Sequence, residues 1–436
     1  MSKVKIASIV VIVLALVGTG IYMLLPKEDP LVEMSTFEKF EAALARQSEI
    51  KEADMLINFN IDIATNDPSM TRMAEILREV DFNYNIKQNM KSLDNLLIEG
   101  LLSMSYHQEP ALNLDFYMDG EKIIFGSKDL ITQLFYLNFK DYEKYMQDIL
   151  ASYGNESQMP SFSMDVQEIM RRSVEFRKEF YSLEGIEGIE NFNGDKYRDM
   201  LEEGLEGLLI EVEPFDVPIM ENGQIKQVSC RGMQLVFNET QLIELMIPIL
   251  EEAKNDGELK KIIITKAEQY MTFANTLYSI DYEAMGIEDP YAAINEGIDD
   301  LEENYIPRIE ELIKILNDYK ETYSGRGFSI DNIIGIDNAG MIIYWDMALT
   351  ANLGLGDTAG ETIKIRSRSI TNSYNQSLEF SDYSKITEEG INVVELMAYP
   401  DSVESQMVLM QLYGSFMQKM SLNPLFRDII MEIGVY

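Results

Sequence analysis

The chain has 436 residues, of which 46% are hydrophobic, and its 74 acidic and 36 basic residues give a formal net charge of −38. A charge of this sign and size repels phosphate groups, so it excludes nucleic acids and anionic lipid surfaces as partners. The length suffices for about two domains with hydrophobic cores. The single cysteine, Cys230, excludes an internal disulfide.

Residues 6–25 form an apolar run without a charged residue. As a helix this run is about 30 Å long, which is the hydrocarbon thickness of a bilayer. Lys3 and Lys5 precede it, and positive charge stays on the cytoplasmic side of a membrane. We therefore expect a cytoplasmic tail at 1–5, a transmembrane anchor at 6–25 and the rest of the chain outside the cytoplasm. The anchor residues are Ile6, Ile9, Val13, Leu16, Ile21 and Leu25.

A cleaved signal peptide is the alternative interpretation of this run. The apolar core of a signal peptide is about 7 to 15 residues long and ends at small residues. Here Gly18-Thr19-Gly20 is followed by further apolar residues up to Leu25, which favours a retained anchor. An outside domain without disulfides fits a Gram-positive or anaerobic bacterium better than a eukaryotic secretory route.

The predicted fold class is α+β, with an N-terminal transmembrane helix followed by two lobes of curved antiparallel sheet packed with helices. The glycine-rich and acidic stretch 184–206 suits a mobile hinge between the lobes. The expected parts are a linker at 26–34, an N-terminal lobe at 35–153, a helical connector and hinge at 154–206, and a C-terminal lobe at 207–436 with a helical insertion at 258–323.

In the first lobe, Ser35-x-x-Glu38 is a capping box that predicts the start of a helix. Alternating apolar residues from Met55 to Ile63 predict a half-buried strand. Asp119-Gly120 predicts a type I′ hairpin turn, in which both central residues take positive φ. Further strands are expected at 82–87, 96–106, 112–118, 122–126 and 135–139, and helices at 68–80 and 141–152.

In the second lobe, Asn222-Gly223 predicts a turn between strands at 208–212 and 224–237. Asn238-x-x-Gln241 is a second capping box, and Pro248 is expected to kink the helix that follows it. A closing meander is predicted at 328–336, 341–349, 362–370, 373–380 and 391–396.

Apolar stripes on two helices of this lobe, the one after Asn238 and the final one at 401–420, form a candidate apolar groove. Methionine is frequent, with 27 residues. Its flexible thioether suits adaptable apolar surfaces, although AT-rich codon usage would produce the same count. The candidate groove residues are Leu242, Met246, Leu250, Met407, Met410 and Met417.

No residue pattern fixes a reaction, a cofactor or a metal. His107 is the only histidine, which excludes sites built on several imidazoles, and its place at a strand end favours a turn or surface role. Ser48-x-x-Lys51 has the spacing of penicillin-recognising enzymes, but no Lys-Thr-Gly strand follows. The glycine-rich stretch 354–360 has no following helix to hold a phosphate, so it is interpreted as a hairpin loop.

Two groups of carboxylates are candidates for a divalent cation or for acid and base catalysis. With 74 acidic residues such groups arise by chance, and no Asp-x-Asp-x-Asp-Gly calcium loop occurs. We interpret them as solvated helix faces and predict neither a metal nor a cofactor. The residues are Glu202, Glu203 and Glu206, and Asp299, Asp300, Glu302 and Glu303.

The stretches Leu114 to Phe125 and Ile334 to Trp345 resemble the hairpins of envelope proteins with a LolA-like or LppX-like half-barrel. Those families wrap a curved sheet around helices and carry lipids or lipoproteins, so the resemblance implies an apolar ligand. This chain departs from the pattern through its predicted membrane span and its helical insertion at 258–323. It is also similar to uncharacterised membrane-anchored proteins of Clostridia-like bacteria, which implies a location but no activity.

Together these predictions describe a bacterial cell-envelope protein, held to the cell membrane with its bulk outside the cytoplasm, that is not an enzyme. The bilayer is the expected partner of the anchor. The body is predicted to bind an apolar ligand, either a lipid or a peptide. The alternatives are a structural or scaffolding partner of an envelope complex and a hydrolase that uses a carboxylate pair.

Overall fold

The computed structural model describes residues 34–92, 96–131, 133–141, 171–173, 175–176, 180, 182–221, 223–277, 292–323, 327–352 and 361–433. The strands are β1 (Glu52–Ala64), β2 (Val80–Asn89), β3 (Leu97–Tyr106), β4 (Glu109–Asp119), β5 (Lys122–Gly126), β6 (Phe135–Asn138), β7 (Leu209–Glu221), β8 (Gln224–Asn238), β9 (Phe328–Ile336), β10 (Ile342–Asn352), β11 (Thr362–Tyr374) and β12 (Ile391–Asn392). The helices are α2 (Thr36–Gln47), α3 (Pro68–Arg78), α6 (Asp195–Leu205), α7 (Glu239–Asn255), α8 (Gly257–Leu277), α9 (Ala292–Tyr323), α10 (Ile386–Glu389), α11 (Val393–Ala398), α12 (Val403–Leu422) and α13 (Pro424–Ile433).

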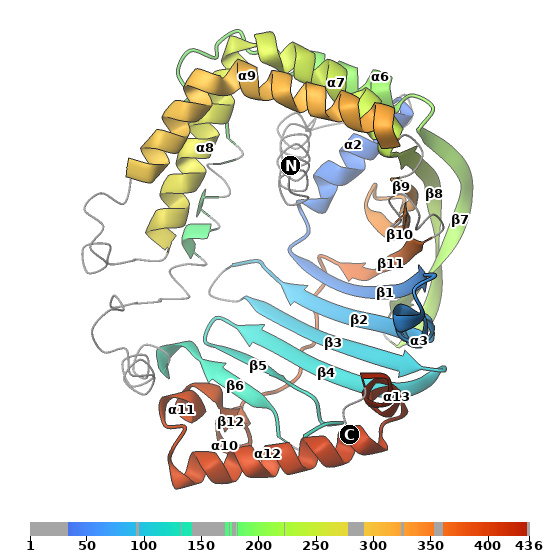
Figure 1. Ribbon diagram of the computed structural model, residues 1–436, viewed down its shortest axis with the longest axis vertical. Coiled ribbons are helices and arrows are strands. Elements are labelled where there is room, and N and C mark those ends of the chain that lie inside the picture. Colours follow the sequence, from blue (N-terminus) through green and yellow to red (C-terminus); the bar gives the residue numbers. More distant parts are fainter. Residues whose placement is uncertain are drawn as a thin grey trace.

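The described strands form one 12-stranded sheet with the order β12-β6-β5-β4-β3-β2-β1-β11-β10-β9-β8-β7. Neighbouring strands are antiparallel except β12 and β6, which are parallel. The sheet bends into an arch, with α6 to α9 at one end and α10 to α13 at the other (Figure 1). Helix α2 lies inside the arch, between the sheet and the helices of the first end.

The predicted fold class is wrong in its division into two lobes. β1, from the predicted first lobe, pairs with β11, from the predicted second lobe, between Ala53↔Tyr374 and Ala64↔Thr362. This pairing satisfies backbone groups that would otherwise form an open sheet edge, so both parts share one sheet. The structure also gives the transmembrane helix no support, because no described helix is long and apolar enough to cross a bilayer. The predicted anchor, from Ile6 to Leu25, lies outside the described residues.

Both predicted capping boxes are confirmed. At the start of α2, the Glu38 amide donates to Ser35 Oγ over 3.1 Å and the Ser35 amide donates to Glu38 Oε2 over 2.7 Å. At the start of α7, Asn238 and Gln241 exchange the same two hydrogen bonds, each 3.0 Å long. Each box satisfies amides that the first helical turn leaves without a partner. α7 then continues through Pro248 to Asn255.

The largest buried cluster joins α2 to the β8–β10 part of the sheet. Phe37 and Phe40 of α2 pack with Met233 of β8 and Ile334 of β9, and the last two side chains have no exposed surface. Leu201 of α6 belongs to the same cluster, and side chains of α7 pack against it. Helices therefore cover the β8–β10 end of the sheet. The middle of the sheet is formed by strands from the first half of the chain.

The hairpin between β4 and β5 occurs where it was predicted, but its turn is not of type I′. Neither Asp119 nor Gly120 has a positive φ. Instead, Asp119 Oδ1 accepts hydrogen bonds from the amides of Glu121 and Lys122, over 2.8 and 2.9 Å, and this side chain shapes the turn. Consecutive positive φ values, 53° and 67°, occur at His107 and Gln108 between β3 and β4. The sole histidine is therefore a turn residue, as predicted.

We expect Gln108→Gly to raise the free energy of unfolding by about 1 kcal/mol, because a left-handed conformation costs a non-glycine residue about 1 to 2 kcal/mol. Chemical denaturation followed by circular dichroism measures the change. Gln108→Ala keeps the steric cost and serves as the control, with no expected gain. Equal stabilities of the glycine and alanine variants would contradict this explanation of the turn.

Two of the predicted closing strands are wrong. β11 runs through to Tyr374, and Asn375 with a φ of 51° ends it, so residues 376–380 are not a strand. The strand predicted at 391–396 is reduced to Ile391–Asn392. The Asn392 side chain accepts hydrogen bonds from the amides of Val394 and Glu395, over 3.0 and 3.3 Å, and so caps α11.

Candidate functional site

The register of the strands divides the sheet into two faces, because successive side chains point to opposite sides. On one face Phe59, Phe82 and Met104 lie opposite one another across β1, β2 and β3. We name it the inner face, because α2 packs on it at the β8–β10 end and lies inside the arch (Figure 1). In β1 to β5 the inner face carries Met55, Ile57, Phe59, Ile61, Phe82, Tyr84, Ile86, Ile98, Leu102, Met104, Leu114, Phe116, Met118, Ile123 and Phe125.

These side chains include no charged group, and two of their rings stack on each other across neighbouring strands. Phe59 and Phe82 stack with 4.4 Å between ring centroids and 14° between ring planes. A Cβ atom added to Gly100 would lie 2.7 Å from the Tyr84 hydroxyl, so the absence of a side chain at this position lets the Tyr84 ring lie across β3. The result is a continuous apolar surface.

The inner face of β1 to β5 is only partly covered by the described residues. Ile57, Phe59, Leu102, Leu114 and Phe116 are half-buried and belong to none of the four buried clusters of the described chain. Four inter-strand spacings and six residue steps along a strand give this area about 20 Å in each direction. An apolar surface of that size is normally covered by a partner, a ligand or another part of the chain.

The opposite, outer face is polar over β1 and β2, with Asn58, Asn60, Asp81 and Asn83 in adjacent positions, whereas at β4 and β5 it is covered, because Tyr117 and Ile124 belong to a buried cluster with Ile386. A sheet with one apolar and one polar face is built to cover only the apolar one. The inner face of β1 to β5, whose central residues belong to no buried cluster of the described chain, is therefore the candidate functional site.

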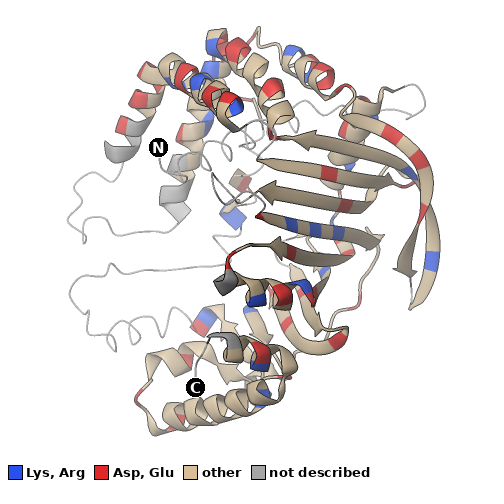
Figure 2. Cartoon of the chain, turned by 45° about the vertical axis from the view of Figure 1, so that its right-hand side comes forward, with Lys and Arg blue, Asp and Glu red and all other residues tan. Residues whose placement is uncertain are grey.

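A charged cluster on the outer face links β10 to β11. Asp346 is almost fully buried and accepts hydrogen bonds from Arg366 Nε and Nη2, over 2.9 and 2.7 Å, and from Arg368 Nη2 over 2.9 Å. Figure 2 shows the basic residues of β11 as alternating bands along the strand. Burial raises the pKa of the Asp346 carboxyl, but the hydrogen bonds from the two arginines outweigh burial and lower it to about 2.

We expect Asp346→Asn to lower the free energy of unfolding by about 2 kcal/mol at neutral pH, because a pKa shift of one unit corresponds to about 1.4 kcal/mol. The native carboxyl has the lower pKa, so its contribution is complete above the unfolded pKa and disappears as the pH falls towards 2. Denaturation of both proteins at pH 7 and near pH 2 tests this. A stability difference that does not shrink in acid would contradict it.

The predicted groove residues do not lie together. Met246 and Leu250 of α7 are buried and Leu242 is half-buried, whereas Met407, Met410 and Met417 of α12 are exposed. α7 and α12 occupy opposite ends of the arch (Figure 1). The sequence did contain the signal for the inner face, because apolar residues alternate in β1 and β2. That alternation was interpreted only as ordinary strand burial.

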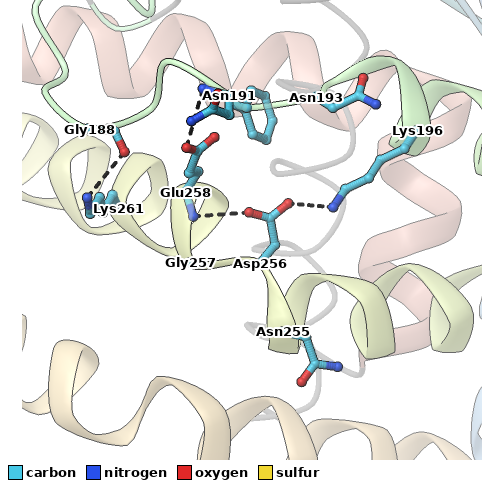
Figure 3. A pocket seen from close by; sticks show the side chains of 10 residues that line it. Gly188, Asn191, Asn193, Lys196, Asn255, Asp256, Gly257, Glu258 and Lys261 are labelled. Carbon is cyan, nitrogen blue, oxygen red and sulfur yellow. Dashed lines mark hydrogen bonds and ion pairs between the residues drawn. The ribbon is translucent and has the colours of Figure 1, made fainter.

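A polar pocket of about 490 Å³ lies between α6, the start of α8 and residues 188–193. Figure 3 shows Asp256 between Lys196 and the Glu258 amide. Its carboxylate accepts from the Tyr197 hydroxyl over 2.8 Å and from the Glu258 amide over 3.0 Å, and lies 2.8 Å from Lys196 Nζ. Burial raises the pKa of Asp256, but the Leu259 amide and Lys196 outweigh burial and lower it.

The charged groups around this pocket form hydrogen bonds within the protein. Lys261 Nζ donates to the Gly188 carbonyl over 3.2 Å, and the Asn191 amide donates to Glu258 Oε1 over 3.3 Å. These contacts fasten residues 188–193 to α8.

The candidate carboxylate groups do not converge on a metal or a reaction centre. Glu202 accepts from the Ser35 hydroxyl over 2.6 Å, and Asp300 pairs with Arg308 and Asn304 on its own helix. The described residues contain no group of three or more acidic, histidine or cysteine side chains placed to hold a metal. Burial raises the pKa of the Cys230 thiol to about 11, so it is not a thiolate near neutral pH.

Comparisons with known proteins add nothing to this geometry. No family model, curated protein or solved structure matches the chain. The two hairpins behind the half-barrel resemblance correspond to β4–β5 and β9–β10, and the resemblance itself stays a prediction. The inner face is therefore the basis of the proposed function.

Proposed function

We propose that the chain binds the acyl chain of an uncharged or zwitterionic lipid on the inner face of β1 to β5. One observation carries the proposal: about 20 Å by 20 Å of the sheet, measured by strand spacing, is apolar, free of charge and only half-buried. The location of the protein outside the cytoplasm and the alternative functions, a scaffold or a hydrolase, stay predictions.

The free energy gained by burying an acyl chain is large enough for lipid binding. Each methylene removed from water contributes about 0.8 kcal/mol, so a chain that buries ten of them gains about 8 kcal/mol before the cost of association. Half-buried rings at Phe59 and Phe116 supply apolar contact surface for such a chain. A flexible acyl chain can follow the curve of the arch (Figure 1).

An acyl chain fits this surface better than a peptide does. A peptide carries an amide and a carbonyl at each residue, and these need hydrogen-bond partners once they leave water. The apolar area offers the Tyr84 hydroxyl as a hydrogen-bond partner. The backbone groups of β1 to β5 cannot serve a peptide, because they are already paired on both sides.

The sheet edges also disfavour peptide binding by strand addition. The edge strand β7 contains Pro214 and Pro218, which donate no backbone hydrogen bond, and charged Glu211 and Glu213. At the other edge, β12 has only two residues. The formal charge of −38 argues in addition against an anionic headgroup.

Native mass spectrometry of the full chain after mild extraction tests the proposal, with phosphatidylcholine as the added probe. We expect a mass increase of one phospholipid, either carried from the cell or gained from the probe. A chain that neither carries nor accepts lipid would contradict the proposal. A bound apolar peptide in place of lipid would overturn it in favour of peptide binding.

A further inference from the structure

We propose that α12 rests on the surface of an uncharged or zwitterionic bilayer. The helix is attached to the body on one side, where Ser415 Oγ donates to the Leu130 carbonyl over 3.4 Å and Lys419 Nζ donates to the Lys128 carbonyl. At its end, the Asn423 side chain donates to the Ala111 carbonyl of β4. The opposite side of the helix faces away from the protein.

That outward side is largely apolar, with Gln406 and Ser421 as its exposed polar residues. Val403, Met407, Met410 and Tyr413 are exposed by 67%, 62%, 68% and 68%. Surface helices of soluble domains turn polar residues outwards, so this arrangement is the reverse of the usual one. Figure 2 shows few charged bands on the helices near the C-terminus, whereas α7 to α9 carry many.

The width of the apolar surface distinguishes a bilayer from a partner helix. At about 100° per residue, the exposed apolar side chains extend from Phe416 through Met410 to Met407 over about 180° of the circumference. A two-helix seam uses a narrower stripe, whereas a helix that lies in a membrane interface buries about half of its surface. The charged residues of α12, Glu404 and Lys419, both fall outside this arc.

The net charge of the protein also favours an uncharged or zwitterionic bilayer as the partner of α12. A second copy of the chain would bring another body with a formal charge of −38 against the first, and anionic lipids would be repelled as well. An uncharged or zwitterionic lipid surface brings no such repulsion. The exposed half of α12 has no charged group that would have to leave water.

A depth measurement tests this surface on the full chain. Cys230 is buried, with 1% exposed, so Met410→Cys introduces a thiol that a fluorescent probe labels selectively. Glu310→Cys on α9, at the other end of the arch and 59% exposed at its side chain, is the matched control. The labelled proteins are mixed with phosphatidylcholine vesicles that contain nitroxide-labelled lipid, which quenches a probe within the interface.

We expect several-fold stronger quenching at position 410 than at position 310. Phosphatidylglycerol added to the vesicles should weaken the quenching, and salt should restore it by screening the repulsion. Equal quenching at the two positions would overturn the proposal. Probe self-quenching that rises with protein concentration and needs no vesicles would overturn it in favour of a second copy. The readout is local to α12, so it is independent of lipid binding on the inner face.

Discussion

Replacement of Leu102 by lysine is expected to weaken phosphatidylcholine binding by about a hundredfold, which corresponds to about 2.7 kcal/mol. Leu102 lies on β3 in the middle of the inner face, opposite Tyr84 and Leu114. An ammonium group held against a bound acyl chain must give up water without a partner, because the neighbouring inner-face side chains carry no charge. A lipid-binding isotherm by native mass spectrometry or fluorescence measures the loss.

The matched control is the adjacent residue of the same strand. Ser103 lies on the outer face opposite Asn83 and Asn113, so Ser103→Lys adds the same charge on the polar side. We expect this variant to bind lipid as the unmodified chain does. Equal loss in the two variants would mean that charge alone matters, and no loss in Leu102→Lys would remove the inner face as the binding surface.

The second large effect concerns the continuity of the sheet. Ile334→Ala is expected to cost about 3 kcal/mol, because Ile334 is fully buried and its truncation leaves a cavity against α2 and β8. Since β1 pairs with β11 and α2 packs on β9, we expect hydrogen exchange to accelerate in α2 and β1 as well as in β9.

Ile210→Ala provides the comparison, because Ile210 is 44% exposed on the edge strand β7. Its cost should stay within about 0.5 kcal/mol. If Ile334→Ala accelerates exchange in β9 and β10 but leaves α2 and β1 protected, the two halves of the chain unfold independently. That result would restore the two-lobe description that the sheet pairing contradicts.

Local patterns in the sequence predicted most strands and the helix starts. The alternation from Met55 to Ile63 lies within β1, and the capping boxes at Ser35 and Asn238 begin α2 and α7. Local patterns carry no information about which distant strands pair, so the β1–β11 pairing was missed. The strand predicted at 391–396 failed because the β-branched residues before Val394 outweighed the cap that Asn392 supplies to α11.

The apolar surface proposed as the site was not among the residues predicted for it. An apolar surface was expected, yet it was assigned to stripes on α7 and α12, which lie at opposite ends of the arch. Met246 shows why, since a helical apolar stripe has the same pattern whether it is buried in a core or open. The same holds for strands, because the alternation in β1 and β2 gives the apolar face but not what covers it.

Photo-crosslinking with a phosphatidylcholine that bears a diazirine in its acyl chain locates the bound lipid on the protein. If the inner face binds the acyl chain, peptide mapping by mass spectrometry finds adducts on inner-face residues of β1 to β4, such as Phe59, Leu102 and Leu114. Adducts spread equally over inner and outer faces, or confined to α12, would contradict acyl-chain binding on the inner face.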